Sequence, residues 1–377
     1  MTPQSRIHSI NFFRKFTVNS IFFLFPLYLL QIGISGWKIG FVAACYAVAP
    51  LLFSFPVGWI NDHLSIRSVI RLSLLTLTLS FLIIGFVQNF FLIGFLFLVV
   101  GMANNALDVS TNNFFYKDQS HVDQNKKYAT MAFWLSLGVA AGTFSGGFLI
   151  HFANFRVMFG IYAILLLIVQ MITGSFGPET FGRITLKEYR KNLFNRKTLR
   201  FALMIFILTL HWGAEGTVYS PFLKEYFGLN NLQLSLYISL PLIMLALASL
   251  SVGLIRFQPD KNKRWFLISL VISGLGHILM VNPNVYLSFT FRVLHEIGDG
   301  FLGALTVLYV SRLFEKRSIG GSSGLLLTLM TMGNMTGALV FSKIGFTWGL
   351  HYPFLISGGL LLADAVYGWW VFRRESY

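Results

Sequence analysis

Five acidic residues interrupt long apolar runs of this chain, which has only 14 acidic residues in its 377 positions. They are Asp108, Glu215, Glu296, Asp299 and Asp364. A charged side chain near the centre of a bilayer costs at least about 2.5–3.5 kcal/mol. Each of these residues therefore needs a partner, a wet cavity or a proton, and the chemistry they indicate is reversible proton binding or hydrogen bonding to a polar ligand.

The polar residues around four of these acids recur at helical spacing, which predicts that they share helix faces. A polar stripe of amides, carboxylates and an arginine suits a polyhydroxylated or zwitterionic solute. We interpret these residues as solute-binding or ion-coupling side chains. They are Asn104, Asn105, Asp108 and Asn112 in one segment, His211, Glu215 and Tyr219 in a second, and Arg292, His295, Glu296 and Asp299 in a third.

The acids differ in their neighbours along the chain. Glu296 follows Arg292 by one turn, so we expect an ion pair there, which could do no more than fix helix packing. Asp108 and Glu215 have no lysine or arginine within a turn on their own segments. Burial without a cation disfavours the charged form of a carboxylate, so these two are the predicted proton carriers, with a hydrogen-bonded structural carboxyl as the alternative.

The elements that must position these residues are membrane spans. The chain is 55% hydrophobic and 11% charged, with a mean hydropathy of +0.68, far from the quarter of charged residues in soluble domains. Its apolar runs are long enough to cross about 30 Å of hydrocarbon. We predict twelve transmembrane helices: 11–32, 39–60, 68–87, 91–113, 129–150, 156–175, 199–222, 233–256, 265–281, 285–312, 320–343 and 353–373.

Basic residues predict the orientation of these spans. With the N-terminus in the cytoplasm, 24 of the 29 lysines and arginines fall on the cytoplasmic side and 4 on the outer side, and Arg292 lies within a span. The positive-inside rule therefore places both termini in the cytoplasm of a multi-pass protein of the cytoplasmic membrane. We divide the chain into an N-terminal six-helix half (1–175), a cytoplasmic linker (176–198) and a C-terminal six-helix half (199–377).

The two halves share landmarks at an offset of 195 residues. Pro26 falls on Pro221, Gly138 on Gly333 and Gly142 on Gly337. Two parallel six-helix halves with a site between them are a known transporter architecture. Glycines one turn apart let helices approach closely, and we consider two roles for them: plain helix packing, and sliding as the halves rock.

The chain resembles the major facilitator superfamily in a stretch after the second span. Gly58, Asp62 and Arg67 follow that family's loop signature, with Ser65 where a glycine is usual. The resemblance implies an all-helical fold with a central cavity between the halves and a cytoplasmic conformational latch that includes Asp62 and Arg67. It also implies that spans one, four, seven and ten line the cavity while spans three, six, nine and twelve face lipid. We interpret His277 and Asp364, on spans nine and twelve, as structural residues, neutral or paired with a neighbouring helix.

Two short stretches are similar to the fucose- and glucose-type proton symporters. They are Leu107-Asp108 with Asn112-Asn113-Phe114, and Gly213-Ala214-Glu215. This resemblance favours proton-coupled uptake, whereas the glycines of the fifth span resemble an exporter signature in which Thr143 replaces a proline. Export of a metabolite or drug, and sodium as the coupling ion, remain alternatives.

Other classes of function have weaker support. The sequence contains no phosphate loop, no H-E-x-x-H pair and no nucleophile elbow, which argues against ATP-driven transport and against hydrolytic enzymes. The net charge of +15 is spread between apolar runs, and this pattern argues against nucleic-acid binding. We expect a monomer in the lipid bilayer, a small-molecule solute, no cofactor and no metal; a non-transporting scaffold or lipid mover and a membrane-embedded enzyme are the competing interpretations.

Overall fold

The chain folds as a bundle of long α-helices in a computed structural model that describes residues 2–63, 65–117, 124–174, 196–254, 259–313 and 319–374. No strand occurs among these residues. The helices of the N-terminal half are α1 (Pro3–Gln31), α2 (Trp37–His63), α3 (Ile66–Ile84), α4 (Phe90–Lys117), α5 (Gln124–Phe152) and α6 (Phe155–Ile172). Those of the C-terminal half are α8 (Arg196–Tyr226), α9 (Asn231–Leu254), α10 (Pro259–Leu279), α11 (Val285–Leu313), α12 (Ile319–Trp348) and α13 (Tyr352–Arg374).

Every predicted span coincides with one of these helices, most of which begin before the predicted apolar run. The largest difference is at α1, predicted from residue 11, because the hydroxyl of Thr2 accepts a hydrogen bond from the amide of Ser5 and Pro3 occupies the first turn. Within the described residues, nine helices are long and apolar enough to cross a membrane, and α6 is a shorter apolar helix. The predicted linker 176–198 lies outside the described residues up to position 195, and α8 begins at Arg196.

The surface of the bundle is apolar where the sequence predicted contact with lipid. Large hydrophobic side chains are exposed along α3, α6, α10 and α13, among them Leu72, Leu79, Ile164, Leu275 and Val366. Monomeric soluble proteins rarely expose contiguous apolar faces of this kind. The chain is therefore an all-α membrane protein.

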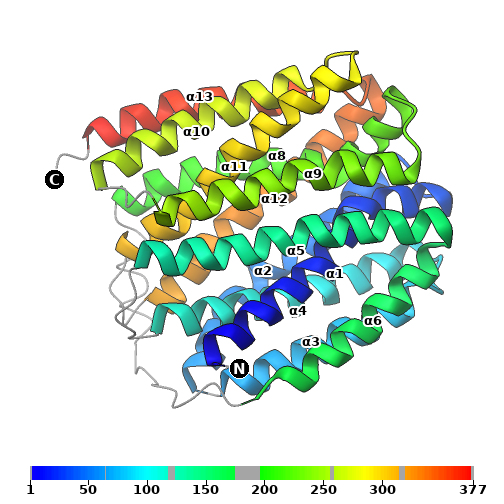
Figure 1. The fold of residues 1–377 in the computed structure, drawn as a ribbon, viewed down its shortest axis with the longest axis horizontal. Helices are drawn as coiled ribbons and strands as arrows, with labels where there is room; N and C mark the ends of the chain where they lie inside the picture. Colours follow the sequence, from blue (N-terminus) through cyan, green and yellow to red (C-terminus); the bar gives the residue numbers. More distant parts are fainter. Residues whose placement is uncertain are drawn as a thin grey trace.

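The two halves lie side by side, with α5 against α9 and α2 against α12. The first turn of α1 and the last turn of α13 lie at the same end of the bundle (Figure 1). At the opposite end the halves touch, because the hydroxyl of Ser342 donates a hydrogen bond to the carbonyl of Gly36, at 3.2 Å. Gly147 of α5 likewise leaves no room for a Cβ atom beside Ser235 of α9.

The glycine repeat corresponds to the same packing in both halves. A Cβ atom added at Gly138 or Gly142 of α5 would meet the backbone carbonyls of Phe12 or Phe16 in α1. At the equivalent Gly333 and Gly337 of α12, it would meet the carbonyls of Phe206 and Leu210 in α8. Both contacts are internal to one half. These four glycines therefore support plain helix packing, and not sliding between rigid halves.

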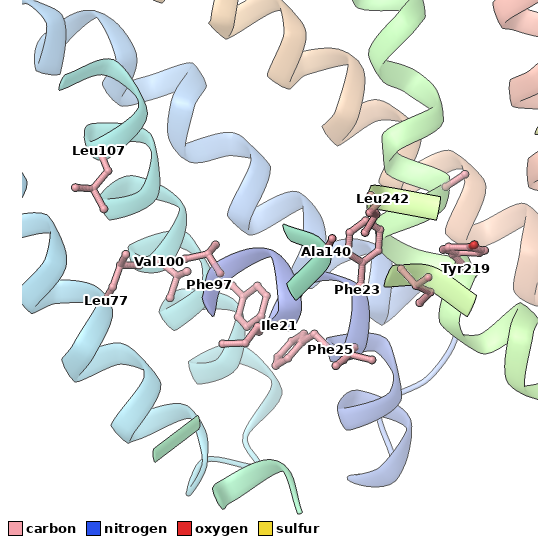
Figure 2. Packing of buried hydrophobic residues seen from close by; sticks show 14 of the residues in the cluster. Ile21, Phe23, Phe25, Leu77, Phe97, Val100, Leu107, Ala140, Tyr219 and Leu242 are labelled. Carbon is pink, nitrogen blue, oxygen red and sulfur yellow. The ribbon is translucent and has the colours of Figure 1, made fainter. Parts of the chain in front are cut away.

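A hydrophobic core holds the helices of each half in place. In the N-terminal half, side chains of α1, α3 and α4 meet, including Ile21, Leu77 and Val100 (Figure 2). Phe25 of α1 stacks on Phe97 of α4 with ring centroids 3.9 Å apart. Aromatic packing of this kind fixes α1 against α4, and these two helices carry the ion pair of Arg14 with Asp108.

Candidate functional site

Arg292 of α11 is the centre of a buried ion-pair network in the C-terminal half. Its guanidinium contacts Glu215 of α8 and Glu296 one turn along its own helix, and it lies over the ring of Tyr219 at 4.5 Å from the centroid. The side chains of the arginine and the two acids are at most 8% exposed. The predicted pair of Arg292 with Glu296 is present in the structure.

Glu215 has no lysine or arginine partner on its own helix, but it is paired with a neighbouring helix. Besides Arg292, the Nε2 atom of His295 lies 3.1 Å from Oε1 of Glu215. Both partners come from α11, so they are 77 and 80 residues away along the chain. Glu215 is therefore held in an ion pair between helices.

Asp299 joins α8, α10 and α11 through hydrogen bonds. It lies 2.9 Å from Nε2 of His211 and accepts hydrogen bonds from the hydroxyl of Ser273 at 2.6 Å and the indole of Trp212 at 3.3 Å. On the same helix, Nδ1 of His295 lies 2.9 Å from the carbonyl of Ser273. The predicted residues of α8 and α11 thus form one connected network, which also includes Ser273 of α10.

His277 of α10 and Asp364 of α13 are both fully buried. The ring of His277 packs 4.4 Å from that of His295 and 5.5 Å from that of His211, centroid to centroid. Among the described residues, neither ring nitrogen of His277 and neither oxygen of Asp364 has a hydrogen-bond partner. The alternative in which these residues pair with a neighbouring helix is therefore not met, and His277 lies inside the predicted site.

A second charged cluster lies in the N-terminal half. Arg14 of α1 contacts Asp108 of α4 at 2.7 Å and donates to the side-chain oxygen of Asn104 at 2.7 Å. Lys15 lies 4.0 Å from Asp108, and Asn104 donates to the hydroxyl of Tyr46 at 2.8 Å. Arg14 is fully buried, whereas the Asp108 side chain is 24% exposed. Asp108 thus also takes its cationic partners from another helix, α1.

The other predicted residues have more varied surroundings. Asn105 is buried and accepts a hydrogen bond from Ser54 of α2 at 2.9 Å, so it packs α2 against α4. Asn112 is half-buried on α4, and the hydroxyl of Tyr219 is buried without a hydrogen-bond partner among the described residues. The side chain of Asp62 lies outside the described part of the chain, while Arg67 is half-buried at the start of α3. The latch therefore remains a prediction.

Sequence reasoning missed Arg14, Lys15, Tyr46 and Ser273. The signal for Arg14 was present, since Asn11 and Arg14 lie at helical spacing at the start of an apolar run, and Asn11 accepts a hydrogen bond from Arg14 at 3.3 Å. Arg14 counts among the cytoplasmic residues in the sequence-based topology because the predicted first span begins near it. Tyr46 and Ser273 carry no periodic signal.

The two clusters use equivalent helices with opposite charges. In the N-terminal half the cation is on the first helix and the acid on the fourth, as Arg14 of α1 and Asp108 of α4. In the C-terminal half the acid is on the first helix and the cation on the fourth, as Glu215 of α8 and Arg292 of α11. Buried charges inside a membrane bundle are costly and mark solute or ion pathways. The fold and these clusters define a polytopic membrane transporter.

The sequence comparison identifies the family. The profile described as Major Facilitator Superfamily matches residues 7–198 and 201–377, and the chain belongs to that family. It is 23% identical over 359 residues to a nitrite extrusion protein of Bacillus subtilis (strain 168), covering 92% of this chain and 88% of the relative. It is also 23% identical over 372 residues to the multidrug resistance protein MdtG of Salmonella choleraesuis (strain SC-B67), covering 93% and 90%.

Solved structures share the fold. The nucleoside transporter NupG superposes with a TM-score of 0.74 at 14% identity, covering 99% of this chain and 100% of that one. The human organic anion transporter MFSD10 superposes with a TM-score of 0.73 at 16% identity, covering 98% and 100%. The protein is thus a secondary transporter of the superfamily and not an enzyme. The more local resemblance to sugar symporters stays a prediction.

Proposed function

We propose that the protein moves a small polar solute across a cytoplasmic membrane in symport with protons, and that Asp108 is the coupling carboxylate. The observation that carries this proposal is the pairing of a partly exposed acid with a fully buried arginine. Asp108 is 24% exposed and contacts Arg14 at 2.7 Å. A proton can reach such an acid, whereas the buried guanidinium cannot exchange its partner for bulk water.

Protonation of Asp108 would change the charge balance of the N-terminal cluster. Ionised Asp108 is paired with Arg14, and Lys15 lies 4.0 Å away. Neutralising the acid leaves two cations beside the amide of Asn104, and a buried cation without a partner is costly. A solute with a carboxylate or several hydroxyl oxygens would supply the missing acceptors. Proton binding and solute binding would then favour each other, as symport requires.

Glu215 is the second candidate for the coupling carboxylate. Its side chain is 8% exposed, and Arg292 and His295 both contact its Oε1 atom. A proton would have to displace two partners from a closed site. In this proposal, the buried Arg292 network of α8 and α11 holds the C-terminal half in shape.

Export is the alternative direction, favoured by two relatives that are named for nitrite extrusion and for multidrug resistance. A proton-driven exporter would bind a solute that competes with the proton at Asp108. The two mechanisms differ in the effect of pH on affinity. Acidification strengthens solute binding in the symporter, because protonation exposes the cations, and weakens it in the exchanger.

The test begins with a thermal-shift screen of purified protein against sugars, nucleosides, amino acids, organic acids and drugs, because a binder raises the unfolding temperature. The binder found is then supplied to proteoliposomes that contain a pH-sensitive dye. We expect Asp108→Asn to lose at least about a hundredfold in solute-driven proton flux, the lower end of the effect of a positioned proton-transfer group, while binding is retained. Glu225→Gln, an exposed acid at the end of α8, is the matched control.

Two outcomes would contradict the proposal. If Asp108→Asn accumulates the solute against a gradient with wild-type pH dependence, the carrier lies elsewhere and Glu215→Gln becomes the decisive variant. If accumulation at constant pH requires sodium, the coupling ion is not a proton, although the site can remain the same.

A further inference from the structure

Four buried side chains of the C-terminal half converge on one point. His211 and Glu215 lie one turn apart on α8, His277 is on α10 and His295 is on α11, and one ligand atom from each lies within 4.8 Å of the others. Three imidazoles and one carboxylate are typical ligands of divalent first-row transition metals. Neither the sequence analysis nor the transport proposal gives this set a metal-binding role.

The distances are compatible with an ion after a small contraction. Metal–nitrogen bonds of about 2.0–2.1 Å place the ligand atoms of a tetrahedral site roughly 3.4 Å apart. The observed limit of 4.8 Å is wider than this. Rotation of imidazole rings about their side-chain bonds can close a gap of about 1 Å without moving the helices.

His277 provides an independent observation. Its ring is completely buried, and neither nitrogen has a hydrogen-bond partner among the described residues. A buried polar group left in that state costs about 1–3 kcal/mol. Because the ring packs against His295 and His211, it is an unpartnered ligand placed beside the other donors. A metal ion at this point would satisfy it.

The surrounding groups hold the rings as metal sites require. Ligating histidines usually direct their second nitrogen to a carbonyl or carboxylate. Nδ1 of His295 lies 2.9 Å from the carbonyl of Ser273, which leaves Nε2 toward the site. Nδ1 of His211 contacts the carbonyl of Leu208, and its Nε2 atom lies 2.9 Å from Asp299. Nε2 becomes a ligand atom once it exchanges Asp299 for the ion, and Asp299 then keeps its hydrogen bonds from Ser273 and Trp212.

The charges of the network suit a dication. With neutral imidazoles, the form that binds metals, the network holds the carboxylates of Glu215, Glu296 and Asp299 against the single guanidinium of Arg292. A divalent ion would bring the sum to zero. Arg292 and His295 both contact Oε1 of Glu215, so Oε2 is the oxygen that can bind an ion while the Arg292 pair persists.

We propose that His211, Glu215, His277 and His295 form a binding site for one divalent transition-metal ion of the class that prefers imidazole, such as Zn²⁺ or Co²⁺. Calcium and magnesium do not fit, since they take mainly oxygen ligands. All four ligands belong to one half and are buried. The ion therefore fastens α8 to α10 and α11 as a resident ion and is not the transported solute. This proposal does not depend on proton coupling at Asp108.

The test uses the purified full-length transporter in detergent after treatment with a chelator. Titrated Co²⁺ should give the visible ligand-field bands of a nitrogen-ligated site, saturating at one ion per chain, and Zn²⁺ should displace it. His277→Ala and the bulkier His277→Gln should each weaken Co²⁺ binding by at least about tenfold, as even loss of an outer partner does at metal sites. His151→Ala, an exposed histidine at the end of α5, should bind as the wild type does.

A thermal measurement separates a lost ligand from a damaged fold. Zn²⁺ should raise the unfolding temperature of the wild type and His151→Ala, and leave that of a monodisperse His277→Gln preparation unchanged. If the wild type binds no Co²⁺ at stoichiometric levels, or if monodisperse His277→Gln binds it with wild-type affinity, the site is refuted. Neither result bears on the Asp108→Asn proton-flux assay, so the two proposals fail separately.

Discussion

Arg292→Met tests whether the network of the C-terminal half is a buried ion-pair system. Arg292 contacts Glu215 and Glu296, and its side chain is 1% exposed. Methionine keeps part of the apolar stem and removes the guanidinium with its charge and its hydrogen bonds to the two acids. Breaking a buried pair by removing one partner costs about 3–5 kcal/mol, because the remaining charge stays buried. Here two carboxylates lose their guanidinium, and Glu215 alone retains His295.

The expected loss is measurable as a melting temperature. For domains of about 150–250 residues, about 1 kcal/mol corresponds to roughly 2–4 °C, so Arg292→Met should unfold about 6–20 °C below the wild type. Glu296→Gln alone should lower the melting temperature by less, because Arg292 keeps its ion pair with Glu215. In the double variant Arg292→Met/Glu296→Gln, no unpaired charge remains at position 296. The loss of unfolding free energy in the double variant should therefore be smaller than the sum of the two single losses by about 0.5–3 kcal/mol.

The assay is thermal unfolding, in a single detergent, of protein that has been treated with a chelator to remove bound metal. Arg264→Met is the control. Arg264 is exposed on α10, and surface substitutions of this kind are usually near neutral. The reasoning is refuted if Arg292→Met melts within about 2 °C of the wild type, a shift below that of 1 kcal/mol. Strict additivity in the double variant would show that the pair does not act as a unit.

Three further predictions concern packing, topology and the conformational cycle. Gly142→Ala should lower the melting temperature, because its Cβ atom would meet the carbonyl of Phe16, whereas Gly160→Ala, with nothing within 4 Å, should not; equal effects would contradict the packing role. Cysteines at Asn89 and Asn282, in a background without Cys45, should react with an impermeant maleimide from outside the cell, and labelling from the cytoplasm would invalidate the predicted orientation. Asp62→Asn should slow transport with nearly unchanged solute affinity, and a large loss of binding with an unaltered cycle would exclude the latch.

The helices of this fold could be predicted from the sequence because a bilayer demands a simple pattern. Each span needs an apolar run of about twenty residues, and every predicted run coincides with a described helix. The boundaries were less predictable, since a helix continues through polar residues until its backbone is capped. Thr2 starts α1 well before the apolar run for this reason.

For the site, the sequence could predict only which residues share a face of one helix. Periodicity correctly grouped His211 with Glu215 and Arg292 with Glu296, because residues one turn apart share a face. It could not show which faces meet. The partners of Asp108 and Glu215 are 94 and 77 residues away along the chain, so both acids seemed unpaired. His277 was interpreted as a structural residue because its span was expected to face lipid, but a helix at the edge of a half also has an inner face.

The two charged clusters lie at different depths, and this separation gives them different tasks. At a rise of about 1.5 Å per residue, Arg14 and Asp108 lie roughly 13–17 Å along α1 and α4 from the helix ends nearest the chain termini. Glu215 and Arg292 lie roughly 10–17 Å from the opposite ends of α8 and α11. The halves touch at that opposite end, through Ser342 and Gly36.

The C-terminal cluster is thus buried toward the end where Ser342 contacts Gly36, while the Asp108 side chain is 24% exposed. A carboxylate that carries protons has to exchange them with water. An ion-pair network that holds helices together has to exclude water. The partly exposed Asp108 is suited to the first task, and the buried C-terminal network is suited to the second. This asymmetry is why the substitutions at Asp108 and His277 should affect separate properties of the transporter, if the two proposals hold.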